Sequence, residues 1–292
     1  MQLLKIIRYI INHPLGRQNK LLVLFKFFIW QFRGLVTNSP YIYQFTSKSK
    51  LSITKGMKGA SGNIYTGLHE FDEMGFLLHF LRPEDTFVDV GANVGTYTIL
   101  ASAEIGAKSI TFEPSPIAFK SLQNNIKLNN IEQKVIAYQI GISKEEKKLY
   151  FTNNLDVENH IVKGEKEDCI IVDVNSLDNL LVDEIPKLIK IDVEGFETDV
   201  IIGAKKLISD TKLKGIIIEL IGLGEKYGFN EMDVRIMLTE AGFYPYSYNP
   251  MTRTLMKVNA IAANNTIYIR DIEFVSNRIK HANTIKILGV NF

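Results

Sequence analysis

The sequence of 292 residues contains a single cysteine, Cys169. A lone cysteine excludes an internal disulfide framework, and the lack of a second one nearby excludes a cysteine-based metal site. No run of eighteen or more residues is free of charge, so no segment is predicted to span a membrane. With a hydrophobic content of 46%, these absences predict a soluble globular protein of a reducing compartment such as the cytoplasm.

Acidic residues are missing from the first quarter of the chain, where Glu70 is the first to occur. The same stretch holds ten basic residues, namely Lys5, Arg8, Arg17, Lys20, Lys26, Arg33, Lys48, Lys50, Lys55 and Lys58. The net charge of +2 is therefore uneven, because the rest of the chain carries 24 basic residues against 32 acidic ones, a net −8. We expect a basic appendage, residues 1–69, joined to an acidic domain, residues 70–292.

Residues 1 to 34 are expected to form two helices, because Pro14 disfavours helix at the preceding residue and suits the first turn of a new one. The second helix is apolar around most of its circumference and leaves a narrow basic stripe at Lys20, Lys26 and Arg33. Such a helix must be covered by the domain, by a second subunit or by a membrane interface. Peripheral contact with the cytoplasmic face of a membrane and burial in a homodimer both stay open.

The stretch from Thr86 to Tyr97, TFVDVGANVGTY, is typical of a buried strand that runs into a glycine turn and then a helix. Gly91 and Gly95 let the backbone turn sharply and approach a ligand. A dinucleotide-binding turn would carry a further glycine near Asn93, so that a pyrophosphate could rest on bare backbone. The carboxylate of Asp89 would repel a phosphate and attract an ammonium or sulfonium group. The pattern favours S-adenosylmethionine over NAD.

A second carboxylate, Glu113, ends the short apolar run SITF eighteen residues after Gly95. At this distance the next parallel strand places a carboxylate beneath a ribose, where it can accept hydrogen bonds from two hydroxyl groups. The spacing alone does not separate NAD from S-adenosylmethionine, since both carry the ribose. Glu113 could also merely cap a turn.

Periodicity predicts further elements on either side of these motifs. Short strands or loops are expected over 41–65, and helices over 70–81, 116–128 and 231–240, with strands over 134–142, 148–152, 170–174, 215–222 and 265–270. The strand at 134–142 ends at Gly141, and a tail helix from Asp271 closes the chain. Residues 153–168 form a polar excursion around His160, which is either part of a substrate loop or a solvated structural histidine.

The run LIKIDVEG, residues 188–195, gathers three ionisable groups at the end of one strand. Alternation along a strand places Lys190, Asp192 and Glu194 on the same side. Ligands of open α/β sheets bind at the carboxyl ends of the strands, so this cluster would face the same crevice as Asp89 and Glu113. The alternative is an ion pair of Lys190 with a carboxylate that has no chemical role.

Five motifs, in order FVDVGANVG, FEPS, IGIS at 140–143, KIDVEGFE and IIIEL, together resemble the FkbM family of S-adenosylmethionine-dependent methyltransferases. The resemblance covers roughly residues 70–219. It implies an α/β class I (Rossmann-like) methyltransferase fold, a seven-stranded, mostly parallel sheet with helices on both faces. It also implies O-methylation of a hydroxyl on a sugar, glycan or polyketide-like acceptor.

By this resemblance, the cofactor S-adenosylmethionine would be held at both ends. The methionyl end would lie against Asp89, Gly91, Asn93 and Gly95. Glu113 would bind the ribose, and Gly141 the edge of the adenine. Asp192 would occupy the position that class I methyltransferases place nearest the transferred methyl group.

Transfer to a hydroxyl requires a base that accepts its proton. Asp192 is the first candidate by position, Glu194 the second, and His160 the third. A divalent metal held by Asp192, Glu194 and Glu219 would serve the same purpose, but carboxylates on two strands are no recognised motif, so no metal ligands are assigned.

Two other functions stay open at this stage. A nucleic-acid methyltransferase would set the basic segment against phosphates, yet that segment carries large apolar side chains and the remainder is acidic, which disfavours it. A scaffold that binds the cofactor without catalysing transfer would retain the same acidic residues. Only an assay separates such a scaffold from an enzyme.

Overall fold

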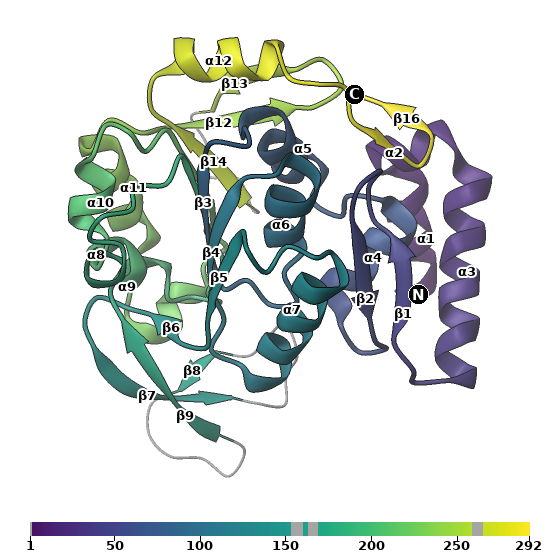
Figure 1. The fold of residues 1–292 in the computed structure, drawn as a ribbon, viewed down its shortest axis with the longest axis horizontal. Helices are drawn as coiled ribbons and strands as arrows, with labels where there is room; N and C mark the ends of the chain where they lie inside the picture. Colours follow the sequence, from purple (N-terminus) through teal and green to yellow (C-terminus); the bar gives the residue numbers. More distant parts are fainter. Residues whose placement is uncertain (1, 153–159, 163–168, 259–264) are drawn as a thin grey trace.

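The computed structural model describes residues 2–152, 160–162, 169–258 and 265–292. Within these residues, eight strands form a central sheet in the order β13-β12-β14-β11-β10-β3-β4-β5. Figure 1 shows this sheet with helices on both of its faces. The predicted α/β fold class is confirmed, with one more strand at the edge than the seven expected, because β13 (Thr254–Lys257) pairs with β12 (Tyr244–Asn249) as a hairpin.

Five neighbouring strands of the sheet are parallel and carry the predicted motifs. They are β11 (Gly215–Glu219), β10 (Leu188–Ile191), β3 (Thr86–Val90), β4 (Lys108–Phe112) and β5 (Val135–Tyr138). β14 (Asn265–Ile269) lies antiparallel between β11 and β12. The carboxyl ends of the five parallel strands therefore meet along one edge.

Alternating side chains of the strands supply two separate cores, one on each face. Phe87 packs with α5 (Phe71–Phe80), α6 (Thr96–Ile99) with its π-helical continuation η1 (Leu100–Ile105), and α7 (Pro116–Leu128). The next residue, Val88, packs on the other side with α8 (Leu177–Leu180), α9 (Glu197–Ile202), α10 (Lys205–Ser209) and α11 (Glu231–Glu240). The apolar strands of a parallel sheet need this cover on both faces.

A second, smaller sheet lies beside the central one and has the order β6-β9-β7-β8 in the described residues. Its strands are β6 (Gly141–Ile142), β7 (Lys147–Thr152), β8 (Ile161–Val162) and β9 (Cys169–Asn175). The single strand predicted over 134–142 was wrong, because the chain leaves the central sheet after Tyr138 and Gly141 pairs with Val174 of β9. Most of the predicted excursion lies outside the described residues.

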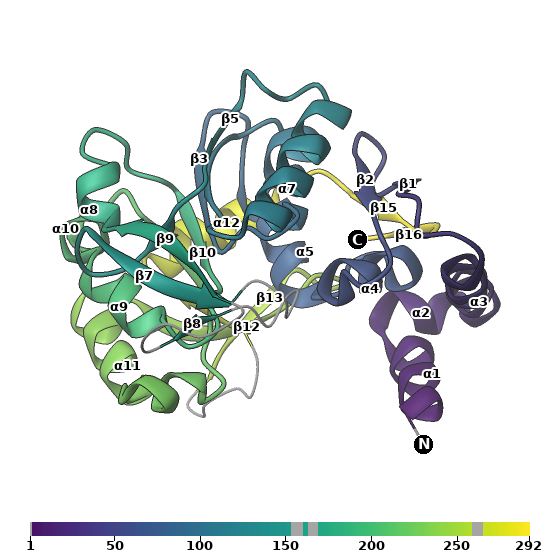
Figure 2. The same ribbon diagram turned by 90° about the horizontal axis from the view of Figure 1, so that it is seen from below.

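The N-terminal part begins with α1 (Gln2–Asn12), α2 (Pro14–Gln18) and α3 (Lys20–Val36), which lie together at one end of the molecule (Figure 2). The break before Pro14 was predicted. The second break was not: the side chain of Asn19 accepts a hydrogen bond from Leu22 N and caps α3 as a separate helix.

β1 (Tyr41–Gln44) and β2 (Lys50–Ile53) form a hairpin, followed by α4 (Lys58–Thr66). Short strands were expected here, but α4 was not, because Gly59 and Gly62 indicated turns. A side chain at Gly62 would collide with the ring of His69, 2.5 Å from Nδ1, so this glycine allows close packing of a helix.

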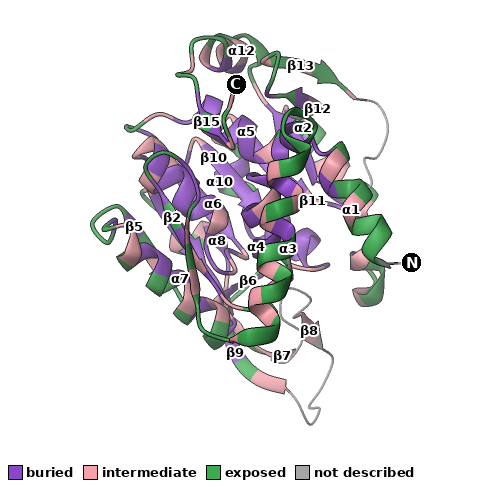
Figure 3. Cartoon of the chain, turned by 90° about the vertical axis from the view of Figure 1, so that its right-hand side faces the viewer, coloured by how far each residue is buried: buried purple, intermediate pink, exposed green. Residues whose placement is uncertain are grey.

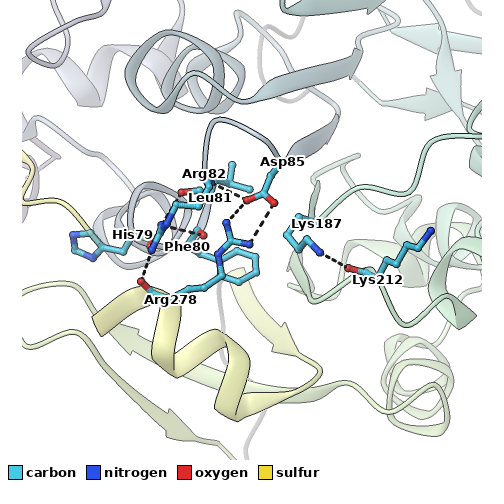
Figure 4. Close-up of polar contacts among 8 residues, drawn as sticks. All are labelled: His79, Phe80, Leu81, Arg82, Asp85, Lys187, Lys212 and Arg278. Carbon is cyan, nitrogen blue, oxygen red and sulfur yellow. Dashed lines mark hydrogen bonds and ion pairs between the residues drawn. The ribbon is translucent and has the colours of Figure 1, made fainter. Parts of the chain in front are cut away.

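The C-terminal part follows β14 with α12 (Ile272–Lys280), as predicted, but the chain does not end there. A hairpin of β15 (Lys286–Ile287) and β16 (Val290–Asn291) comes after it. Arg278 of α12 donates to Asp85 Oδ2 at 2.5 Å and to Oδ1 at 3.3 Å, and Arg82 donates to Arg278 O at 2.6 Å (Figure 4). This bidentate, mostly buried ion pair fixes α12 to the segment after α5.

Candidate active site

One cavity of about 270 Å³ opens at the carboxyl edge of the parallel strands. Seven of the nine predicted cofactor-binding and catalytic residues line it: Asp89, Gly91, Asn93, Glu113, Gly141, Asp192 and Glu194. Lys190 and Glu219 line it as well. Gly95 is not among the lining residues and begins α6 with φ +89°, packed against Leu122 of α7. His160 is not among them either, although its neighbour Ile161 is. The backbone of His160 is instead bonded to Thr152 in the small sheet.

The turn after β3 brings two neighbouring strands into contact through bare backbone. Gly91 has φ +81°, and a Cβ atom there would lie 1.8 Å from the carbonyl oxygen of Asp192. The backbone N–H groups of Gly91 and Ala92 both donate to Phe112 O at 3.0 Å. Asn93 then adopts φ +51°, a left-handed conformation that asparagine tolerates. The turn therefore needs glycine for its close contact with the backbone of Asp192 as much as for any ligand.

Glu113 is held by two backbone donors on the wall of the cavity. Its Oε2 accepts from Asn93 N and its Oε1 from Ser115 N, each at 2.8 Å. Burial raises the pKa of Glu113 to about 7, and the two backbone bonds oppose that shift. Each carboxylate oxygen can accept a second hydrogen bond. Glu113 thus joins the two motifs and presents a rigid pair of acceptors.

Asp89 is buried at the end of β3, with 2% of its surface exposed. Its Oδ2 accepts from Thr98 Oγ1 at 2.6 Å and from Thr98 N at 3.1 Å. Burial raises the pKa of Asp89 to about 6, although these bonds and the nearby Lys190 lower it. Thr98 belongs to α6, so the carboxylate also ties the helix to the strand.

Lys190 lies beside Asp89 in the sheet register and is 2% exposed. Its Nζ donates to Asp192 Oδ2 at 3.1 Å and to Asn265 Oδ1 at 3.0 Å. Burial by itself would lower the pKa of Lys190, but the surrounding carboxylates, Asp192 first, outweigh it and raise the pKa above its usual range. The ion pair that the sequence left as an alternative is present. The side chain of Asp192 nevertheless keeps 32% of its surface exposed.

Three carboxylates converge next to this lysine. Asp192, Glu194 and Glu219 can each offer an oxygen within 4.8 Å of the others. Burial, and then the charge of Asp192, raise the pKa of Glu219 to about 8. Oxygens in such a cluster suit a hard cation. The ammonium of Lys190 already places one positive charge against Asp192, which weakens the attraction for another.

Sequence reasoning missed His69 and Glu70, which line the same cavity from the two positions just before α5. Tyr97 donates to Glu70 Oε2 at 2.7 Å, and Asn265 to its Oε1 at 2.5 Å. Tyr9 of α1 lies 2.9 Å from His69 Nδ1, and burial lowers the pKa of His69, which favours a neutral ring. No motif surrounds this pair, and contacts with residues so distant in sequence left no local signal.

A second, more open cavity adjoins the first and reaches the N-terminal helices. His69, Glu70 and Glu219 line both cavities. Lys5 and Arg8 of α1 line the far part of the second one. The small sheet covers the other side of the first cavity with apolar side chains, namely Ile142, Phe151, Ile161, Val172 and Val174. The site thus has a closed apolar side and a side that opens toward basic residues.

Two known methyltransferases are similar to this chain in sequence. Methyltransferase 1 of Beauveria bassiana is 32% identical over 149 residues, which are 41% of this chain and 59% of that protein. Hexuronic acid methyltransferase AglP of Haloferax volcanii is 29% identical over 175 residues, 59% of this chain and 69% of the relative. The chain therefore spans about three fifths of the first relative and about two thirds of the second.

A solved structure of a methyltransferase FkbM from Methylobacillus flagellatus is 16% identical, with a TM-score of 0.46, and the match covers 72% of this chain and 52% of that one. The family model described as the methyltransferase FkbM domain matches residues 89–245. That match begins at Asp89 and includes every carboxylate that lines the first cavity except Glu70. Because it extends over more than half of the residues, the chain belongs to the FkbM family of methyltransferases.

Proposed function

We propose that this protein transfers a methyl group from S-adenosylmethionine to a hydroxyl group of a sugar or glycan. The observation that carries the proposal is the convergence of Asp89, Glu113 and Asp192 on one cavity, next to a turn in which Asn93 stands in place of a phosphate-binding glycine. Buried carboxylates with raised pKa values favour a ligand that brings positive charge and hydroxyl donors. The family match supports the same reaction.

The residues present fit S-adenosylmethionine. Glu113 would accept hydrogen bonds from the ribose hydroxyls with the lone pairs that Asn93 N and Ser115 N leave free. Asp89, Gly91 and Asn93 would hold the methionyl end, and Gly141 the edge of the adenine, with Gly95 shaping the turn from behind. When bound, the cofactor supplies an electrophilic methyl group on a sulfonium.

The chain itself must orient the acceptor oxygen and remove its proton. Orientation contributes most to displacements of this kind, because it replaces the entropy loss of bringing two reactants together. We assign the base to Asp192, through Oδ1, because Oδ2 is bonded to Lys190. Glu194 is the second candidate, since it borders the same space. His160 is the third, and its side chain would have to approach from the small sheet.

The acceptor would enter through the second cavity. Lys5 and Arg8 lie along it, so a sugar that bears a carboxylate or phosphate would find basic partners there. The relative named as a hexuronic acid methyltransferase supports an acidic sugar as the acceptor. The same basic residues could meet nucleic acid, but a single acidic group can lie against Lys5 and Arg8 alone, whereas a row of phosphates would extend beyond them. Along the rest of the cavity it would meet the carboxylates of Glu70, Asp72 and Glu73, which repel it.

The test is a transfer assay with isotope-labelled S-adenosylmethionine against panels of nucleotide sugars, glycans and RNA. We expect label in a uronic acid or another sugar, and none in RNA. Calorimetry on the same protein should give micromolar-class binding of S-adenosylmethionine and none of NAD. Binding of NAD would contradict the cofactor assignment, whereas cofactor binding without transfer to any panel would indicate a scaffold.

A further inference from the structure

Helix α3 presents a continuous apolar face to solvent. Its exposed side chains recur at intervals of three and four residues, which places them along one side of the helix. They are Leu21, Phe25, Phe28, Ile29, Phe32, Leu35 and Val36. The exposure is large, at 84% for Leu21 and 81% for Leu35. Figure 3 shows α3 along one side of the molecule with exposed residues on its outward face.

The opposite side of the same helix is already packed on protein. Val23 and Phe27 are buried with Ile10 of α1, and the ring of Phe27 lies edge-on to Tyr65 of α4, with centroids 5.4 Å apart. Leu288 of the C-terminal hairpin packs against this cluster. The expectation that the helix would be buried by the domain thus holds for one face alone. An apolar face of this length on the other side marks an interaction surface.

The charges around this face indicate what covers it. By helical spacing Lys20, which is exposed, and Lys26 and Arg33, which are partly exposed, border the apolar face. No residue before Glu70 is acidic. A second copy of the chain docked face to face would bring two such basic sets together, which opposes association. An anionic lipid surface instead offers hydrocarbon to the apolar side chains and phosphates to the basic ones.

The dimensions favour a helix that lies on the membrane. Among the residues that the structure describes, no helix combines the length and the apolar character needed to cross a bilayer. α3 has 17 residues and is held along its inner side by the protein. We propose that the outward face of α3 docks on the anionic surface of a lipid bilayer, with the helix axis in the plane of the interface. This docking is independent of methyl transfer and of the acceptor.

The test measures sedimentation of the full chain with vesicles of phosphatidylcholine, with and without phosphatidylglycerol. The double variant Phe28→Asp/Phe32→Asp removes two exposed side chains one helical turn apart. Its matched control is Met232→Asp/Ile236→Asp, which makes the same charge change at the same spacing on α11, where these residues are 46% and 49% exposed. Circular dichroism establishes that both variants are folded.

We expect binding to the anionic vesicles that weakens with salt, because the basic contribution is screened. The α3 variant should bind at least about tenfold more weakly, the effect of losing two buried phenyl groups, and the α11 control should bind like the unmodified protein. Equal loss in both variants would overturn the proposal, and so would no binding by the unmodified chain. A dimer in solution that the α3 variant alone dissociates, without vesicle binding, would assign the face to a second copy.

Discussion

The cavity at the sheet edge buries charged side chains, whereas helix α3 exposes apolar ones. At the cavity, carboxylates are buried and tied to donors of the chain, as Asp89 is to Thr98 and Glu113 to Asn93. On α3, large apolar side chains stand in solvent between basic residues. Each arrangement is costly in the isolated protein. The two proposals assign a different partner to each region: a ligand that carries a sulfonium group in the cavity, and an anionic lipid surface on α3.

The cavity differs also in how its charges depend on pH. Burial raises the pKa of Asp89 to about 6, of Glu113 to about 7 and of Glu219 to about 8. At neutral pH these groups are therefore partly protonated until a ligand stabilises their ionised forms. On α3, by contrast, partial burial lowers the pKa of a basic group, Lys26. The cavity can therefore be tested by titration and by removing single carboxylates.

Asp192→Asn should have the largest effect on catalysis. Loss of a general base is expected to lower kcat by about 10² to 10⁴ and to change the affinity for S-adenosylmethionine only a few-fold. Single-turnover assays and calorimetry measure the two quantities. The amide preserves the shape of the side chain and an acceptor for Lys190.

Asp178→Asn is the matched control for this substitution. Asp178 accepts from Lys206 N and Leu207 N at 2.9 Å, away from the cavity, so its amide variant should keep kcat. Near-normal turnover of Asp192→Asn would contradict the assignment of the base and direct the test to Glu194 and His160. Activity that chelators remove and magnesium restores would favour a metal between the three carboxylates.

Gly91→Ala tests whether the glycine turn is required by the fold itself. The new Cβ would meet the Asp192 carbonyl oxygen at 1.8 Å, and φ is +81°. Backbone strain and overpacking together should lower the free energy of unfolding by about 3–4 kcal/mol. Gly228→Ala isolates the strain, because φ is +82° and no atom lies within 4 Å of its Cβ.

For Gly228→Ala we expect a loss of only about 1–2 kcal/mol in denaturant titration. Similar losses in both variants would mean that the backbone around Gly91 and the Asp192 carbonyl moves apart easily to admit the new Cβ atom. A bound ligand rather than packing would then fix the conformation of the turn, and the cavity would be less rigid than its hydrogen bonds indicate.

Glu113→Ala should weaken binding of S-adenosylmethionine by roughly 1.5–3 kcal/mol, the scale of hydrogen bonds to a charged group. The affinity for S-adenosylmethionine should also fall as the pH is lowered. The ionised carboxylate is the better acceptor and the pKa is raised to about 7, so affinity should be full above pH 8 and decline as the pH falls through 7. Calorimetry across this range measures it.

Glu113→Gln keeps one acceptor and cannot titrate, so its affinity should lack the step near pH 7 that belongs to this group. The remaining decline should come from Asp89, closer to pH 6. An unchanged affinity in a folded Glu113→Ala protein would return this residue to the role of a turn cap between Asn93 and Ser115.

The comparison also explains which parts of the molecule were predictable from sequence. The strand, turn and helix around Gly91 were predictable, because the strand propensity and the turn residues there agree with the global fold. The bounds of α7 were predicted for the same reason: Ser115 caps it and Pro116 begins it. The carboxylates at the ends of β3, β4 and β10 followed from one rule about parallel sheets.

Elements whose formation depends on distant contacts were missed. The helix α4 is held by packing of Gly62 on His69, and β6 exists because Gly141 pairs with β9 more than thirty residues later. His69 and Glu70 join the site through Tyr9 and Asn265, on other elements. The helix α3 was predicted to be apolar around most of its circumference, but sequence could not tell which side the domain would cover.

The smallest predicted effect concerns the boundary at residue 69 between appendage and domain. Asn125 of α7 is fully buried, accepts from Ser52 N at 2.7 Å and donates to Val94 O at 2.9 Å, so one side chain links β2 to the glycine turn. Asn129, one turn later, accepts from Lys50 N at 2.7 Å nearer the surface. Leu51 and Ile53 of β2 belong to the same core as Phe87.

Asn125→Ala should therefore lower the free energy of unfolding of the whole chain by about 1–2 kcal/mol, because two buried backbone groups lose their partner. Asn129→Ala should cost about half as much, since water can replace its bonds. Denaturant unfolding followed by far-UV dichroism and by the fluorescence of Trp30 on α3 should give one coincident transition in both variants. If the tryptophan signal changes first and its midpoint ignores Asn125→Ala, residues 1–69 unfold as a separate unit. In that case the appendage and the catalytic domain differ in folding as they do in charge.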